Sequence, residues 1–311
     1  MDASTDRQPS FHDPVDPPPA GEPWTVLRLL RWSTQYLEEK DVPDGRLDLE
    51  HLLAHVLATT RLELYLQFER PLTDEELSAF KPLLLERANR RPLQYILGRA
   101  PFRELDLQVD ERVLIPRPET EELVEAVLAR VREWGREGLS AVDVGTGSGA
   151  IALSLVTEGP FRKVVAIDRS SDALKVAEAN LQESGPAGAR VELREGDLLD
   201  PVTGDERFDV VVANLPYVSR QEFGELEPEV REWEPQGALV ARDGGLELIR
   251  RLVSRAPSVL HPGGLLALEV GADQARQVAQ AMDEEDALGA PLILRDLARR
   301  DRIVLATMDG P

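Results

Sequence analysis

The chain has 311 residues, and its 57 acidic against 36 basic side chains give a formal net charge of −21. This length suits two domains, and the acidic balance argues against a partner held mainly through phosphate contacts, which require clustered lysine and arginine. Cysteine is absent, which excludes disulfides, thiolate metal sites and cysteine nucleophiles, and no metal site is predicted. No apolar stretch of the sequence approaches the roughly 20 residues of a membrane span. The N-terminus also lacks a secretory pattern, so we expect a cytoplasmic protein without a membrane partner.

The N-terminal third is predicted to contain a tail and a small helical domain. Residues 1–23 are rich in proline and poor in large apolar residues, which predicts a disordered tail. Residues 24–100 carry apolar residues at three- and four-residue intervals, which predicts an all-helical domain. Within it, Thr73 and Glu76 have the spacing of a capping box that opens a helix, and Pro82 is expected to kink or divide that helix. The domain shows no catalytic constellation, so we expect it to bind or position a partner.

Residues 101–140 are expected to connect this domain to a larger one that covers residues 141–311. There, short β-branched runs alternate with helical stretches, which is typical of a parallel sheet with helices on both faces. The predicted strands are 141–144, 163–167, 191–194, 208–213 and 264–270, and the predicted helices are 151–157, 171–184, 245–254 and 272–282. Residues 292–296 and 302–307 are too close for a helical crossover, so they are expected to pair antiparallel at one edge. The predicted class is therefore α/β, with a doubly wound, mostly parallel sheet.

The strongest local signal is a glycine-rich turn between a buried strand and a helix. It consists of Gly145, Thr146, Gly147, Ser148 and Gly149. Glycines allow the backbone to turn sharply and to approach a ligand closely. The spacing is G-x-G-x-G, which differs from the G-x-G-x-x-G fingerprint of dinucleotide sites. Asp143, two residues before the first glycine, suits a ligand with a cationic amino-acid portion such as S-adenosylmethionine, whereas it would repel a pyrophosphate.

Acidic residues follow the next two predicted strands. Asp168 ends its strand 19 residues after Gly149, and a carboxylate at that place can accept hydrogen bonds from both ribose hydroxyls. Asp197 could accept a hydrogen bond from the amino group of an adenine while Leu198 covers the ring, although a surface turn explains these two residues nearly as well. These positions predict a nucleoside site beside the glycine-rich turn.

The reaction is indicated by Asn214, Leu215, Pro216 and Tyr217, which follow an apolar strand. Methylating a nitrogen conjugated to a π system is difficult because its lone pair is delocalised. The side-chain oxygen of Asn214 and a main-chain carbonyl can accept the two N–H hydrogens and aim the lone pair at a methyl group. Tyr217 can pack on the planar group that carries the nitrogen. The segment therefore predicts transfer of a methyl group to an amide or ring amino nitrogen.

Together these motifs resemble those of the peptide chain release factor N5-glutamine methyltransferases (the PrmC/HemK family), over residues 24–307. The resemblance extends to residues 91–98, 113–121, 234–239, 260–264 and 268–271, of which Ile115-Pro-Arg-Pro-Glu-Thr-Glu121 is the most specific. It implies a class I S-adenosylmethionine-dependent methyltransferase fold. It also implies methylation of the side-chain amide nitrogen (N5) of the Gln in the Gly-Gly-Gln loop of class-I release factors, with the helical domain helping to engage that protein.

By matching motif positions, the resemblance implies that residues 145–149 cradle the methionine end of the cofactor and Asp168 holds the ribose. Leu198 would lie near the adenine, and residues 214–217 would grip the Gln amide. The family pattern is Asn-Pro-Pro-Tyr, whereas Leu215 occupies the second position here. That position acts through its main-chain carbonyl, which leucine keeps, and Pro216 still biases Leu215 toward an extended backbone. We therefore expect an active but slower enzyme.

Three other functions stay open at this point. An adenine-N6 methyltransferase acting on DNA or RNA would use a similar grip on a flipped base, but the charge of −21 makes a basic channel harder to build, so no stable nucleic-acid partner is expected. Leu215 is compatible with a non-catalytic S-adenosylmethionine-binding scaffold. A dinucleotide oxidoreductase is disfavoured by the glycine spacing. Arg117 is expected to order the cofactor or a substrate loop, and the acidic run 222–234 is either that loop or a solvated face.

Overall fold

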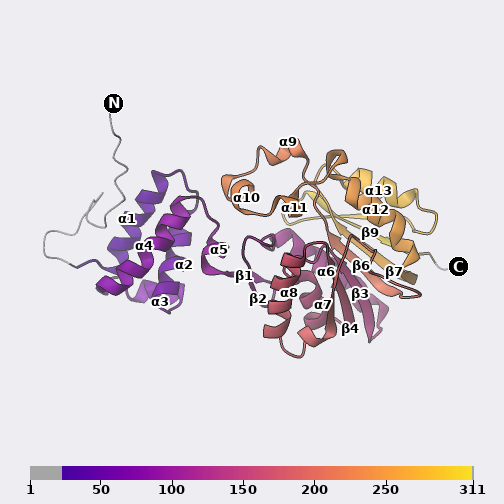
Figure 1. Ribbon diagram of the computed structural model, residues 1–311, viewed down its shortest axis with the longest axis horizontal. Helices are drawn as coiled ribbons and strands as arrows, with labels where there is room; N and C mark the ends of the chain where they lie inside the picture. Colours follow the sequence, from indigo (N-terminus) through magenta and orange to yellow (C-terminus); the bar gives the residue numbers. More distant parts are fainter. Residues whose placement is uncertain (1–22, 310–311) are drawn as a thin grey trace. The chain divides into compact units, whose positions relative to one another are not determined.

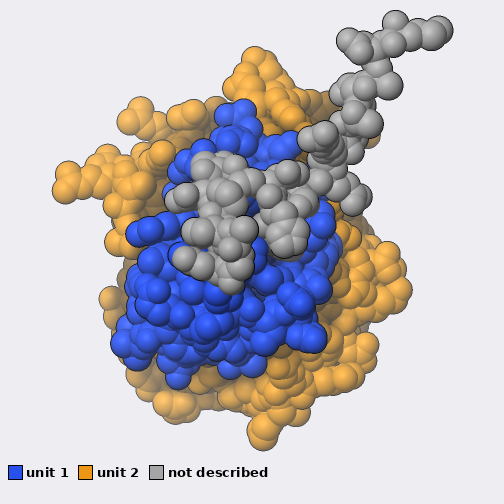
Figure 2. Space-filling model, turned by 90° about the vertical axis from the view of Figure 1, so that its left-hand side faces the viewer, with its two compact units in different colours: residues 1–97 blue, residues 98–311 orange. Residues whose placement is uncertain are grey.

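The computed structural model describes residues 23–309, so all of the predicted tail except Pro23 lies outside the described residues. The chain divides into two compact units, one that ends at Leu97 and one that begins at Gly98 (Figures 1 and 2). Each unit has hydrophobic cores of its own.

The first unit is helical, as predicted. Its helices are α1 (Val26–Glu38), α2 (Gly45–Val56), α3 (Arg61–Leu66), α4 (Asp74–Ala88) and α5 (Leu93–Leu97). The capping box is confirmed, because the Thr73 side chain accepts from the Glu76 backbone N–H while Glu76 accepts from the Thr73 backbone. Helix α4 continues through Pro82, so the expected division is wrong. Phe80 and Leu84, on either side of Pro82, are both fully buried, and their packing holds the two halves of the helix in one core.

The second unit is built on a seven-stranded sheet with the order β5-β4-β3-β6-β7-β9-β8. Its strands are β3 (Leu139–Val144), β4 (Phe161–Asp168), β5 (Val191–Glu195), β6 (Phe208–Asn214), β7 (Leu260–Glu269), β8 (Leu292–Arg295) and β9 (Asp301–Thr307). The first five strands in this order are parallel, and β9 is antiparallel to both β7 and β8. The predicted mostly parallel sheet and its antiparallel edge pair are both confirmed.

Helices cover both faces of this sheet (Figure 1). They are α6 (Pro118–Trp134), α7 (Ala150–Glu158), α8 (Ser171–Glu183), α12 (Glu247–Arg255) and α13 (Ala275–Asp283). Because successive strand residues point to opposite faces, Ala141 packs in the core with α6 and α7, whereas Val142 packs in the core with α12 and α13. This double covering is the doubly wound arrangement that the alternating pattern predicted. None of the described helices combines the length and apolarity needed to cross a membrane.

The segment predicted as a connection carries structure that the sequence pattern did not indicate. Strands β1 (Arg99–Phe102) and β2 (Leu105–Gln108) form an antiparallel hairpin, and α6 follows it. Phe102 and Leu107 are buried in the same core as α6 and α7, so the hairpin is part of the larger unit. Shorter helices lie elsewhere in this unit: α9 (Arg220–Phe223), α10 (Pro228–Trp233), α11 (Gln236–Leu239), η1 (Gly188–Arg190), η2 (Asp243–Gly245) and η3 (Ala256–Ser258).

Candidate active site

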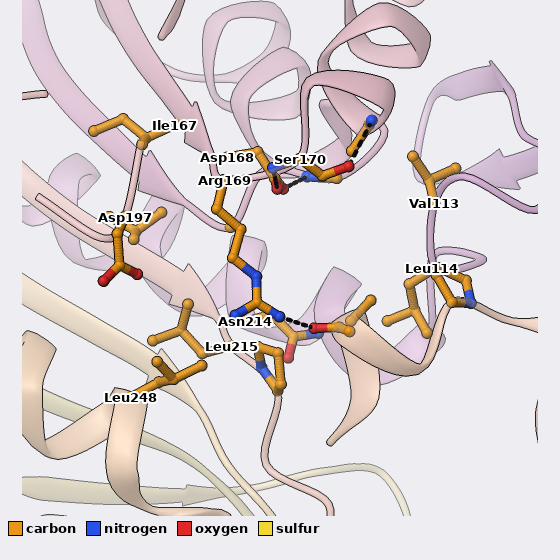
Figure 3. A pocket seen from close by; sticks show the side chains of 18 of the residues that line it. Val113, Leu114, Ile167, Asp168, Arg169, Ser170, Asp197, Asn214, Leu215 and Leu248 are labelled. Carbon is orange, nitrogen blue, oxygen red and sulfur yellow. Dashed lines mark hydrogen bonds between the residues drawn. The ribbon is translucent and has the colours of Figure 1, made fainter. Parts of the chain in front are cut away.

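The candidate site lies at the carboxyl ends of β3, β4 and β6, where the strand order reverses around β3. A pocket opens at this edge (Figure 3). Eight of the predicted site residues line it: Gly145, Gly147, Asp168, Asp197, Leu198, Asn214, Leu215 and Pro216. The other predicted site residues, Asp143, Thr146, Ser148, Gly149 and Tyr217, do not line this pocket.

The glycine-rich turn needs glycine for reasons of backbone conformation. Gly145, Gly147 and Gly149 have φ values of +79°, +56° and +84°, which is the left-handed region that other residues rarely adopt. A Cβ atom on Gly145 would also lie 3.1 Å from the Cδ2 atom of Leu215. The turn therefore presents bare backbone to the pocket at Gly145 and Gly147, as close binding of a ligand requires.

Asp143 lies behind this turn. Its side chain is fully buried, and Oδ2 accepts from the hydroxyl of Thr146 at 2.6 Å and from the N–H of Ala152 at 3.2 Å. Burial raises the pKa of Asp143 to about 7, and Oδ1 has no hydrogen-bond partner among the described residues. Asp143 thus ties the turn to the first residues of α7. The role of Asp143 toward a cationic ligand stays a prediction.

Asp168 is held rigidly between two backbone segments. Its Oδ2 accepts from the N–H of Gly147 and its Oδ1 from the N–H of Ser170, both at 2.9 Å (Figure 3). A carboxylate has about four acceptor positions, so each oxygen keeps capacity for a further hydrogen bond. Asp168 lines the pocket at the end of β4 and is therefore placed to accept two vicinal hydroxyls, the feature expected of a ribose site.

The loop after β5 supplies an apolar and an acidic side chain. Leu198 is buried, and its φ of +49° is unusual for a residue with a branched side chain. Such strained residues cluster at functional sites. Asp197 also lines the pocket, and its Oδ2 accepts from Arg251 at 2.5 Å. The loop can therefore offer Leu198 to the face of a ring and Asp197 to its edge.

Asn214 sits at the end of β6 with its carboxamide fixed on one side. Its Nδ2 donates to the hydroxyl of Thr120 at 2.9 Å, and no group in residues 23–309 donates to its Oδ1. Leu215 is buried in the core and also lines the pocket. Tyr217 does not line the pocket, and its hydroxyl lies 3.5 Å from Oε1 of Glu269. Burial raises the pKa of Tyr217 to about 12.

Several wall residues were not identified as such from the sequence. They include Val113, Leu114, Arg169, Pro235, Gly237, Ala238 and Leu248. Segments 113–121 and 234–239 did stand out by resemblance, but no local pattern shows that they meet. In the structure Arg117 pairs with Glu234 at 2.5 Å, and Glu234 also accepts from the N–H of Ile115. Arg117 thus holds the end of the acidic run against the segment that contributes Val113 and Leu114 to the pocket wall.

Arg169 adds a second tie to the same region. Its side chain extends from the end of β4 along the pocket, and Nη2 donates to the carbonyl of Gly237 at 2.8 Å (Figure 3). The pocket is therefore bounded by glycine backbone, by apolar side chains such as Leu114 and Leu248, and by the carboxylates of Asp168 and Asp197. These groups suit a ligand that has an apolar ring, a ribose and a charged amino-acid end.

Comparison with known proteins finds a matching family for each of the two units. The model of the "PrmC N-terminal domain" family matches residues 28–98, and that of the "Methyltransferase domain" family matches residues 136–299. A release factor glutamine methyltransferase of Geobacter sulfurreducens is 43% identical over 83% of this chain and 88% of its own length. One from Rhodopirellula baltica is 37% identical over 91% of this chain and 96% of its own length.

A solved structure agrees with the fold. A methyltransferase from Pyrococcus furiosus superposes with a TM-score of 0.50 at 19% identity, covering 67% of this chain and 91% of that one. At this identity the likeness concerns the fold alone. It confirms the expected methyltransferase arrangement of sheet and helices.

Proposed function

This chain belongs to the release factor glutamine methyltransferase family, and on that premise we propose its reaction and the residues that perform it. The reaction is transfer of a methyl group from S-adenosylmethionine to the side-chain amide nitrogen (N5) of the Gln in the Gly-Gly-Gln loop of class-I release factors. The observation that carries the assignment of residues is the orientation of Asn214, whose Oδ1 receives no hydrogen bond from the described chain while its Nδ2 is engaged by Thr120.

The groups that line the pocket suit the parts of S-adenosylmethionine. In our proposal Gly145 and Gly147 offer backbone to the methionine end, and the carboxylate of Asp168 accepts from both ribose hydroxyls. Leu198 covers the adenine, and Asp197 accepts from its amino group. Asp143, Thr146, Ser148 and Gly149 contribute by holding the glycine-rich turn in place, since Asp143 bonds both Thr146 and the start of α7.

Residues 214–217 are proposed to hold the Gln amide. Asn214 Oδ1 accepts one amide N–H and the carbonyl of Leu215 accepts the other, which fixes the plane of the amide so that the face carrying the nitrogen lone pair turns toward the methyl donor. Tyr217 is proposed to pack beside the planar amide. When bound, S-adenosylmethionine would supply an activated methyl group with its sulfur as the leaving group, and Asn214 and Leu215 would present the amide nitrogen to that group, with one amide proton passing to water.

The proposed substrate also implies a cellular compartment and a protein partner. Release factors act in translation, so we propose that the enzyme works in the cytoplasm on a protein partner. The PrmC N-terminal domain match over residues 28–98 makes the helical unit the natural candidate for engaging that partner.

The experiment is a transfer assay with methyl-labelled S-adenosylmethionine and three acceptors in parallel: a class-I release factor, its Gly-Gly-Ala loop variant, and nucleic acid. Label on the intact release factor alone is the expected result. Label on the Gly-Gly-Ala variant or on nucleic acid would contradict the proposal.

The role of Asn214 is tested in the same assay. Asn214→Ala is expected to lower turnover by about a hundredfold, because the amide loses its orienting acceptor. Gln280→Ala is the control, because it removes an exposed carboxamide on α13, outside the pocket and outside the helical unit, and should leave turnover unchanged. Turnover of Asn214→Ala within threefold of the natural enzyme would remove Asn214 from the proposed grip.

A further inference from the structure

Two buried residues outside the pocket wall connect to Asn214 in a hydrogen-bonded row. The Nδ2 of Asn214 donates to the hydroxyl of Thr120 at 2.9 Å. That hydroxyl in turn donates to Oε2 of Glu269 at 2.7 Å. Neither Thr120 nor Glu269 lines the pocket, and both side chains are buried.

The three residues come from different parts of the fold. Asn214 and Glu269 are the last residues of β6 and β7 and face each other in the parallel ladder. Thr120 lies 94 residues before Asn214, in the first turn of α6. It belongs to the segment 115–121 that carries the most specific part of the resemblance, and of which only Ile115 and Arg117 have been given a role so far.

Charged and polar groups surround the carboxylate of Glu269. Arg302 from β9 and Glu119 from α6 act on it through their charges, and the hydroxyl of Tyr217 lies 3.5 Å from Oε1. Burial raises the pKa of Glu269 to about 7, while the hydrogen bond from Thr120 and the charge of Arg302 act in the other direction and favour the ionised carboxylate. In that ionised form the carboxylate only accepts hydrogen bonds.

The row has a direction because a hydroxyl carries a single hydrogen. Once Thr120 gives its hydrogen to Glu269, it can only accept from Asn214, so the NH2 group of Asn214 must point toward Thr120. Without this constraint, the terminal torsion of an asparagine has two nearly equivalent orientations. The flipped orientation would turn an NH2 group toward the NH2 group of a substrate amide, and two donors cannot bond each other.

We propose that Thr120 and Glu269 are positioning residues that fix the carboxamide of Asn214 with its oxygen toward the substrate amide. This inference rests on the proposed function, since it assigns a role to Asn214 in holding the Gln side chain. It predicts that the hydroxyl of Thr120 matters for methyl transfer but not for binding of S-adenosylmethionine.

Three variants of the full chain test the hydroxyl: Thr120→Ser, Thr120→Ala and Thr120→Val. Serine and alanine differ from each other only by the hydroxyl, while valine keeps the shape of threonine without its donor. Should valine disturb folding, the serine and alanine pair still gives the comparison, since alanine is the better helix former. Ser154→Ala is the matched control, because it removes a buried hydroxyl on α7 that has no hydrogen-bond partner in residues 23–309.

The readouts are kcat and KM on a class-I release factor, the Kd of S-adenosylmethionine, and the thermal midpoint. We expect Thr120→Ala and Thr120→Val to lower kcat about ten- to a hundredfold, as misplacement of an orienting group does. Thr120→Ser should stay within about threefold of the natural enzyme, and all variants should bind S-adenosylmethionine with unchanged Kd.

Two results would overturn the inference while the natural enzyme methylates the release factor. One is full kcat in Thr120→Ala, and the other is an equal loss of kcat in Thr120→Ser and Thr120→Ala, which would make shape rather than the hydroxyl responsible. If the natural enzyme itself transfers no label to the release factor, the proposed function fails, and the inference fails with it.

Discussion

Replacing Asp168 with asparagine is expected to weaken binding of S-adenosylmethionine by about ten- to a hundredfold. Both carboxylate oxygens already accept backbone N–H groups, from Gly147 and from Ser170, and each is proposed to accept one ribose hydroxyl as well. A hydrogen bond to a charged group contributes about 1.5–3 kcal/mol, so the two ribose bonds amount to about 3–6 kcal/mol. Asparagine keeps one acceptor oxygen and turns an NH2 group toward one of the two backbone donors. About half of this energy, about 1.5–3 kcal/mol, is then lost, which corresponds to roughly a ten- to hundredfold rise in Kd.

The measurement is titration calorimetry with S-adenosylmethionine and with S-adenosylhomocysteine, which share the ribose and should lose affinity to the same degree. Asp172→Asn is the matched control, because Asp172 lies four residues later, in the first turn of α8, and pairs with Lys175 on the exposed surface. It should leave both Kd values unchanged. A folded Asp168→Asn protein whose Kd stays within threefold of the natural value would refute the assignment of Asp168 to the ribose.

Two further predictions concern Leu215 and the buried carboxyls. Leu215→Pro restores the family pattern, so it should raise kcat on a release factor while removing buried leucine contacts at about 1–3 kcal/mol of unfolding free energy; unchanged kcat would show that the missing ring is unimportant. Burial raises the pKa of Asp143 and of Glu269 to about 7, so between pH 4.5 and 7 the folded state binds more protons than the unfolded state. Their contribution to the unfolding free energy therefore falls as pH rises through this window. Glu269→Gln should flatten that decline in denaturant titrations, and an equal slope in both proteins would contradict it.

The sequence predicted the parts of the fold that depend on local periodicity. Strands β3, β4, β6 and β7 are buried apolar runs bounded by glycine or polar residues, and such runs are readable without any tertiary information. The hairpin of β1 and β2 was not recognised because each strand has four residues, too few for an alternating pattern to stand out. Helix α6 was likewise overlooked, although Pro118 at its start and Gly135 at its end are typical helix boundaries.

In the candidate site, the residues that follow strands could be predicted, whereas those that depend on distant contacts could not. Parallel strands end at one edge, so Gly145, Asp168 and Asn214 were expected together, and they line one pocket. The bonds of Asp143 to Thr146 and Ala152 depend on side-chain direction near the end of β3, which no spacing reveals. The contact of Thr120 with Asn214 joins residues 94 positions apart and depends on how α6 packs against the sheet.

The segment 115–121 contacts both the wall of the cofactor pocket and the residue proposed to hold the substrate amide. Near its start, Ile115 and Arg117 both bond Glu234, which holds the wall of residues 234–238 over the pocket. One helical turn later, Thr120 orients the carboxamide of Asn214. Because Leu215 replaces a proline of the family pattern, the backbone after Asn214 is less restricted by covalent structure. In the proposed grip this freedom affects the carbonyl of Leu215, whereas the carboxamide of Asn214 is fixed separately by the bonds that Thr120 and Glu269 supply.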